Sequence, residues 1–178
     1  MLATKHSAAT VDVRRGGSGS AKATKGSTAS ATGDEEGRAS AAAKEDSTAS
    51  ADGLQSGQAS ARALKQSTAR AGASFRGEAT AVARKQSTAS AGTYFGRATA
   101  LARQQSTATA TAGGGASATA FATQGSTASA AANGGGFASA WAWDGAQAIA
   151  DDTAPPQCIA PPGRARVKSS AGNCEAGF

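Results

Sequence analysis

The chain has 178 residues, of which 39% are hydrophobic (mostly alanine) and 4% aromatic, with a formal net charge of +6. So few large side chains exclude a conventional hydrophobic core, and a composition so rich in Ala, Ser, Thr and Gly is by itself typical of disorder. A regular internal repeat argues against disorder, because a fixed period of this length is typical of stacked arrays.

The triplet Ser-Thr-Ala recurs every 20 residues, with one interval of 19. Its serine stands at Ser27, Ser47, Ser67, Ser87, Ser106 and Ser126. Each period contains two alternating segments, such as Ala59–Ala63 and Ser67–Ala71. Degenerate copies at Ser7–Val11, Gly19–Ala23 and Ala146–Ala150 extend the array in both directions.

Strict alternation predicts strands, because successive side chains of a strand point to opposite faces. Alanine favours helix, but the sequence shows no helical face at a spacing of 3.6 residues. We therefore predict an all-β fold, a two-sided flattened β-solenoid of about 20 residues per coil with a tight, alanine-rich core. Leu54, Phe75 and Phe95 fall in the wider connection, and we expect them to plug that corner.

Three regions follow from the repeat: an N-terminal segment with a degenerate first coil (1–16), the solenoid repeats (17–150), and a tail (151–178) expected to cap the array. The tail contains all four prolines and both cysteines, Cys158 and Cys174. The alternatives for these cysteines are a disulfide, which would fit an extracellular protein, or two unpaired thiols. Met1–Lys5 shows no apolar signal segment, so we expect a mature secreted protein or export by another route. No stretch is long and apolar enough to span a membrane, so no membrane partner is expected.

Catalytic motifs are not apparent. The chain has one histidine, His6, so it offers neither a histidine-based relay nor a histidine-rich metal site. The glycine runs 113–115 and 134–136 lack the Lys-Ser/Thr that follows in a phosphate-binding loop. We therefore expect no enzyme activity, no metal and no cofactor.

Basic residues gather in the short connection between the two segments: Lys25, Lys65, Arg84, Lys85 and Arg103. Acidic neighbours such as Glu45 indicate a solvated edge. Aromatic residues do not interleave with this basic stripe, so no nucleic acid partner is expected, although binding of a polyanion remains a weaker hypothesis.

The first segment displays an apolar stripe that grows in size toward the C-terminus: Val82, Leu101, Phe121 and Trp141. Exposed apolar stripes usually mark a contact. Either the tail folds back over this stripe, or it is a partner site, so the protein is expected to be a monomer or a dimer through the stripe.

The second segment displays two ranks of small hydroxyl groups, interrupted only by Arg70. The candidate site residues are Thr28, Ser30, Thr48, Ser50, Thr68, Thr88, Ser90, Thr107, Thr109, Thr127 and Ser129. Thr and Ser suit any solvated β-face, but that does not explain why charge is kept off these ranks. A flat lattice of methyl and hydroxyl groups can order water into a sheet that matches an ice plane.

Two runs, Thr107-Ala108-Thr109-Ala110-Thr111 and Thr28-Ala29-Ser30-Ala31-Thr32, carry a family resemblance. Over roughly residues 17–150 the style of repeat resembles the flat β-solenoid antifreeze proteins of insects, above all the Ala/Ser/Thr-rich longhorn-beetle type with Thr-x-Thr-x-Thr ranks. The resemblance implies adsorption to an ice surface without a cofactor. The chain departs from that pattern in Arg70 and in its second-rank serines. The alternative function is a structural or adhesive β-solenoid, such as an extracellular fibre or an adhesin shaft.

Overall fold

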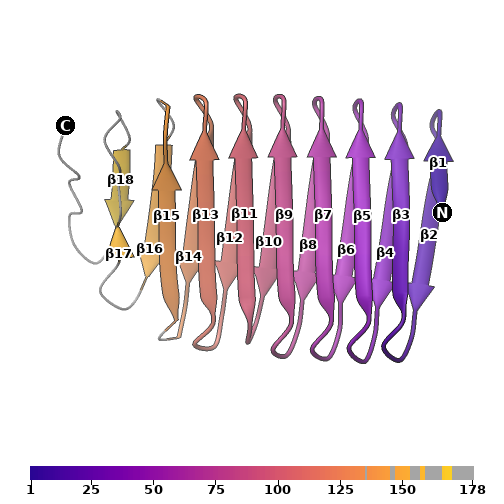
Figure 1. The fold of residues 1–178 in the computed structure, drawn as a ribbon, viewed down its shortest axis with the longest axis horizontal. Coiled ribbons are helices and arrows are strands. Elements are labelled where there is room, and N and C mark those ends of the chain that lie inside the picture. Colours follow the sequence, from indigo (N-terminus) through magenta and orange to yellow (C-terminus); the bar gives the residue numbers. More distant parts are fainter. Residues whose placement is uncertain (135, 145–146, 153–156, 159–165, 170–178) are drawn as a thin grey trace.

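The computed structural model describes residues 1–134, 136–144, 147–152, 157–158 and 166–169. Within these residues the chain forms a β-solenoid of two nine-stranded parallel sheets, as the repeat predicts. Figure 1 shows the strands of each sheet side by side and pointing the same way, up in the front sheet and down in the back sheet, with the chain alternating between the two sheets. Odd-numbered strands form the first sheet and even-numbered strands the second.

The first sheet, in spatial order, consists of β1 (Leu2–Thr4), β3 (Ser18–Thr24), β5 (Arg38–Lys44), β7 (Gln58–Leu64), β9 (Glu78–Arg84), β11 (Arg97–Arg103), β13 (Ser117–Thr123), β15 (Phe137–Ala142) and β17 (Gln157–Cys158). The second sheet consists of β2 (Ala8–Val13), β4 (Thr28–Gly33), β6 (Thr48–Gly53), β8 (Thr68–Ala73), β10 (Thr88–Thr93), β12 (Thr107–Ala112), β14 (Thr127–Ala132), β16 (Gln147–Asp152) and β18 (Arg166–Ser169). Each strand pairs with the equivalent strand one coil away.

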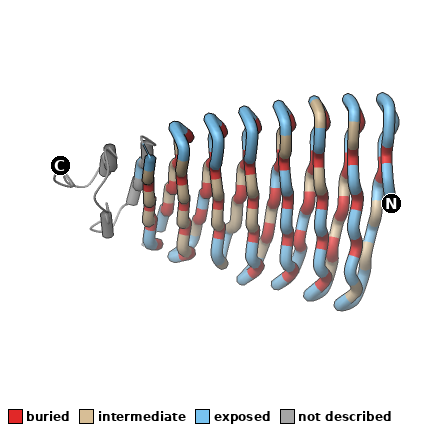
Figure 2. The backbone as a smooth tube through the Cα atoms, turned by 45° about the horizontal axis from the view of Figure 1, so that its top comes forward, coloured by how far each residue is buried: buried red, intermediate tan, exposed pale blue. Residues whose placement is uncertain are grey.

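Alanine fills the space between the sheets. The cluster of buried hydrophobic residues consists of alanine alone, with Val11 packed against it, and many of these alanines have no exposed surface. Burial alternates nearly residue by residue along the strands from β1 to β15, so red and lighter segments follow one another in Figure 2. Because no fully buried side chain of this interior is larger than serine, burial of each residue contributes little, and the continuous backbone ladders supply much of the order.

Two kinds of corner join the sheets. A short corner of three residues, such as 65–67, follows each first-sheet strand from β3 to β13, and a long corner, such as 74–77, follows the second-sheet strands. Both kinds turn through positive φ, as at Lys65 (59°) and Gln66 (57°) or Phe75 (47°) and Arg76 (64°). The long corners also bring backbones together: a Cβ on Gly77 would lie 2.5 Å from the carbonyl oxygen of Gly57. Glycine at this position therefore permits the close stacking of successive corners.

The interval of 19 residues arises in a long corner. The corner 94–96 has three residues where the preceding corner, 74–77, has four, and the strands on either side remain in register.

The prediction that apolar residues plug the long corners from inside is wrong. Leu54, Phe75 and Phe95 are 43%, 61% and 40% exposed, because the alanine sheets leave no room between them for larger side chains.

Candidate functional site

The outer face of the second sheet between β4 and β14, here called the hydroxyl face, carries its side chains in three ranks along the solenoid axis. The first rank is threonine in six successive coils, each paired in register with the next: Thr28, Thr48, Thr68, Thr88, Thr107 and Thr127. Parallel-strand geometry spaces these residues about 4.7 Å apart. All six are exposed or half-buried.

A buried serine immediately before each threonine fixes the position of this rank. The hydroxyl of Ser67 donates a hydrogen bond to the carbonyl oxygen of Leu64 (2.9 Å) and accepts one from the amide of Ser47 (3.3 Å). The carbonyl oxygens of the serines from Ser7 to Ser106, in turn, each accept a bond from the threonine amide of the next coil. For all six threonines this bond to the preceding coil is 3.0 Å long. The first rank is therefore evenly spaced from end to end.

The second rank lies two residues further along each strand, about 6.6 Å from the first by strand geometry. It consists of Ser30, Ser50, Arg70, Ser90, Thr109 and Ser129. All eleven predicted hydroxyl residues thus lie on one face, in two ranks. Arg70, which is exposed, interrupts the second rank at its middle.

A third rank was only partly anticipated from the sequence, through Thr32 and Thr111. It consists of Thr32, Asp52, Gly72, Gly92, Thr111 and Ala131. Asp52 is exposed, accepts a hydrogen bond from the hydroxyl of Ser50 (3.3 Å) and extends over Gly72. Charge on the hydroxyl face is therefore not confined to Arg70. A negative group stands beside it, near the N-terminal half of the array.

The outer face of the first sheet, here called the cationic face, is different. Its positively charged residues all point outward and are exposed: Lys22, Arg38, Lys44, Arg62, Arg84, Arg97 and Arg103. The sequence assigned Arg84 and Arg103 to the short corner, but both are the last residues of strands, β9 and β11. Lys25, Lys65 and Lys85 do lie in short corners. The positive charge is thus spread over a face rather than confined to an edge.

One carboxylate in a short corner is held by two lysines. The ammonium of Lys65 donates a hydrogen bond to Oε1 of Glu45 (3.3 Å), and that of Lys44 lies 3.5 Å from the same oxygen. The hydrogen bond from Lys65 is the main reason why the pKa of Glu45 lies below its usual range, with the charge of Lys44 adding to the effect. Both ion pairs are solvated, and the one between Glu45 and Lys65 links two successive coils.

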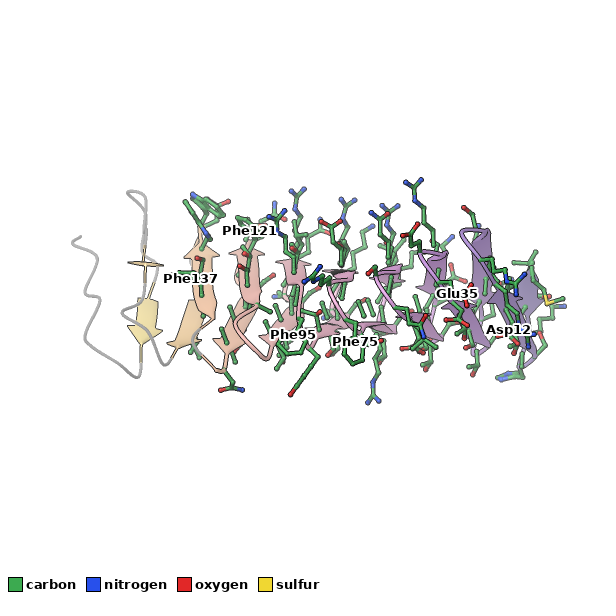
Figure 3. The ribbon with its side chains drawn as sticks, turned by 90° about the horizontal axis from the view of Figure 1, so that it is seen from below. Asp12, Glu35, Phe75, Phe95, Phe121 and Phe137 are labelled. Carbon is green, nitrogen blue, oxygen red and sulfur yellow. The ribbon has the colours of Figure 1, made fainter. Side chains whose placement is uncertain are left out.

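The apolar stripe lies at the C-terminal end of the cationic face. Val82, Leu101, Phe121 and Trp141 follow one another in register and are all half-buried. Phe121 and Trp143 are parallel to within 2°, with ring centroids 6.3 Å apart, and Trp141 stacks against both at 6.0 and 6.2 Å. Figure 3 shows Phe121 on the face from which nitrogen-tipped side chains rise along the middle of the ribbon.

A second aromatic group lies on the outside of the irregular long corner. Tyr94 and Phe95 meet edge to face at 4.5 Å, and Phe75 lies 6.3 Å from Phe95. Phe75 and Phe95 are neighbours in Figure 3, away from Phe121. Phe95 lies against the backbone at Gly114, where a Cβ would collide with the ring. These rings therefore pack against the next long corner from outside the coil.

Other predictions concern parts of the chain about which less is described. The side chain of Cys158 and all of Cys174 lie outside the described residues. Of the tail, residues 157–158 and 166–169 pair with β15 and β16 as β17 and β18, and the segments that could cover the apolar stripe lie outside the described residues. Among the described residues, no group of three or more His, Cys, Asp or Glu side chains is arranged to hold a metal ion. In the same part of the chain, no helix has the length and apolar character needed to cross a membrane.

Comparison with known proteins adds no relative: no protein-family model, no curated protein and no solved structure matches the chain.

Proposed function

We propose that the protein binds ice through the hydroxyl face. The observation that carries the proposal is the first rank: six threonines in register, each held by a backbone hydrogen bond of 3.0 Å to the preceding coil. Such a rank presents methyl and hydroxyl groups at one repeated spacing. Water molecules bound to it acquire the same spacing, which favours adsorption to an ordered ice plane over contact with liquid water.

The rigidity of the scaffold supports this role. The threonine side chains are β-branched and therefore have few rotamers, and neighbours in register restrict them further. The backbone beneath them is continuously hydrogen-bonded, with a core too tightly packed to rearrange. Little conformational entropy is therefore lost when the face becomes immobile against ice.

The two ends of the hydroxyl face differ in the number of charged side chains they carry. Coils from Thr88 to Ser129 carry hydroxyls in the first two ranks and no charge in the third, whereas Arg70 and Asp52 lie in the coils before them. Charged groups hold their own hydration shells and oppose an ice-like water layer. We therefore assign most of the ice contact to β10, β12 and β14.

The test is thermal hysteresis and ice-crystal shaping by the purified protein, beside Thr88→Tyr and a matched control, Thr80→Tyr. Thr88 and Thr80 belong to the same coil but face outward from opposite sheets. The proposal expects activity in the parent and in Thr80→Tyr, and its near-complete loss in Thr88→Tyr. If the folded parent protein shapes no crystals, ice binding is wrong, and the array is better regarded as a structural or adhesive shaft.

A further inference from the structure

We infer that the cationic face is a second functional surface, which binds single-stranded nucleic acid independently of the hydroxyl face. The first observation is charge. Among the described residues, the cationic face carries seven Lys or Arg side chains against a single carboxylate, Glu78. The charged side chains described on the outer face of the second sheet are, by contrast, Arg70, Asp12 and Asp52. Among the described residues, the outer face of the first sheet therefore carries a net positive charge, and the outer face of the second sheet does not.

The cations on this face are largely available to a partner. Of the seven, Lys44 alone has a carboxylate within 4 Å in the described part of the chain, that of Glu45 at 3.5 Å. Five of the seven are arginines, whose guanidinium groups bind phosphate in a bidentate manner. Arg84 and Arg103 lie in register on adjacent strands, about 5 Å apart along the axis and within the screening length of about 8 Å at physiological salt, so their fields add.

A rank of hydroxyls runs between these cations. Ser20, Ser40, Ser60, Thr80, Thr99 and Thr119 stand in register, with Arg38 and Arg97 in the rank on one side. On the other side lie the ranks that contain Arg62 and Arg103. Hydroxyls donate to phosphate and sugar oxygens as readily as to water. A polymer lying along the axis would meet hydrogen-bond donors and cations together.

The aromatic group supplies the feature that separates nucleic acid from other polyanions. A shallow depression on this face is lined by Leu101, Arg103, Phe121, Thr123 and Trp143, so an arginine and parallel π faces share one site. Aromatic platforms beside a positively charged surface are how proteins bind single strands, with bases stacked on rings and phosphates on cations. A sulfated polysaccharide has no planar base to place there.

The shape of the face selects single strands over duplexes. The major groove of DNA admits a helix or a two-stranded ribbon, and a broad flat sheet of parallel strands cannot enter it. In a duplex the bases are also stacked on each other and cannot reach Phe121 or Trp143. An extended strand lies on a flat surface with both its phosphates and its bases in contact.

The experiment measures binding of a fluorescent oligo-dT by anisotropy over a range of salt concentrations. The key variant is Arg84→Ser/Arg103→Ser, and its control is Arg70→Ser/Arg76→Ser, which removes the same charge from the hydroxyl face and a long corner. We expect the first to weaken binding at least about tenfold and to reduce the slope of log affinity against log salt by about 1.4, or about 0.7 for each lost phosphate contact. The control should match the parent. Equal weakening in both variants would overturn the inference.

A second variant, Trp143→Leu, tests the aromatic contribution while retaining an apolar side chain. Loss of stacking on one base is expected to weaken oligo-dT binding about 5- to 150-fold and to leave binding of heparin unchanged. If Trp143→Leu has no effect, or if duplex DNA, heparin or vesicles containing anionic lipid bind more tightly than oligo-dT, the single-strand assignment is wrong. Thr88→Tyr should bind oligo-dT like the parent, which separates this result from that of the ice experiments.

Discussion

The amide of Ser47 donates a hydrogen bond to the hydroxyl of Ser67, 20 residues later and 3.3 Å away in the next coil. The same bond recurs from Ser27 to Ser47, Ser67 to Ser87, Ser87 to Ser106 and Ser106 to Ser126, at 3.2 to 3.3 Å. This ladder is buried at the short corners, next to the alanine interior. It satisfies an amide and a carbonyl in every coil and sets the register of the threonine that follows.

Substitution of one rung, Ser67→Ala, should therefore destabilise the fold. The amide of Ser47 and the carbonyl of Leu64 would both lose their hydroxyl partner in a buried place, which costs about 1–3 kcal/mol in the free energy of unfolding. Chemical denaturation monitored by circular dichroism measures the change. Ser60→Ala, at an exposed position of the cationic face, is the control and should stay within about 0.5 kcal/mol of the parent. Equal effects of the two substitutions would mean that the ladder contributes nothing.

A larger side chain in the interior should be poorly tolerated. Ala89 has no exposed surface and lies in a cluster composed of alanine. Ala89→Leu would have to push the sheets apart over several coils, so we expect at least about 3 kcal/mol of destabilisation, the upper part of the range for overpacked cores. Ser90→Leu places the same side chain on the outer surface one residue later. Denaturation midpoints that move equally in both variants would contradict an interior limited to methyl groups.

The sequence predicted the interior and the hydroxyl face because both depend only on which residues alternate. Ala29 and Ala31 point inward and Thr28 and Ser30 outward under any parallel register of these strands. The inward position of Ser27 and its equivalents follows from the same alternation. The structure adds how that row bonds, from each amide to the hydroxyl of the next coil.

The cationic face was missed for a related reason. The recurring segment, as in Ala59–Ala63, covers five residues, whereas the strand β7 runs from Gln58 to Leu64. Hydrogen bonding to the adjacent strands on both sides extends each strand by one residue beyond each end of the repeated segment. The side chains of these added residues point outward from the sheet. Arg84 and Arg103 were thus assigned to a corner, and of the third rank only Thr32 and Thr111 were anticipated, without Asp52. Corner conformation depends on φ values that alternation does not encode, which is why Phe75 and Phe95 were placed inside.

One buried hydroxyl weakens the structure at the irregular corner. The Oγ1 atom of Thr93 is buried and, among the described residues, has no hydrogen-bond partner. The residues paired with Thr93 in the adjacent coils are Ala73 and Ala112. Thr93→Ala should therefore stabilise the fold by about 1 kcal/mol, because it removes an unsatisfied polar group. Thermal unfolding against Thr99→Ala, a substitution on the outer surface, measures the gain. A lower melting temperature for Thr93→Ala would contradict this account.

A hydroxyl in place of Arg70 in the second rank should increase the proposed ice-binding activity. Arg70→Ser would make that rank continuous in hydroxyls from Ser30 to Ser129. We expect greater thermal hysteresis than the parent at equal protein concentration, since the guanidinium no longer disturbs the water layer between two ordered halves. Arg76→Ser, in the adjacent long corner, removes the same charge away from the face and should leave hysteresis unchanged. A gain in both variants would point to net charge instead of the face.

The carboxylate of Glu45 offers a prediction that concerns pH. Its pKa is lowered in the folded protein by the hydrogen bond from Lys65, so the folded state binds its proton less readily than the unfolded state. The stabilisation is therefore present above the ordinary pKa of a glutamate and is lost as the pH falls through the lowered value. Because the pair is solvated, the effect on stability is small, and titration of the carboxyl carbon by NMR is the direct measurement. In Lys65→Gln the pKa of Glu45 should rise toward the ordinary range, whereas Lys85→Gln, one coil further, should leave it in place. An unchanged pKa in Lys65→Gln would assign the shift to Lys44, the second lysine beside the same oxygen.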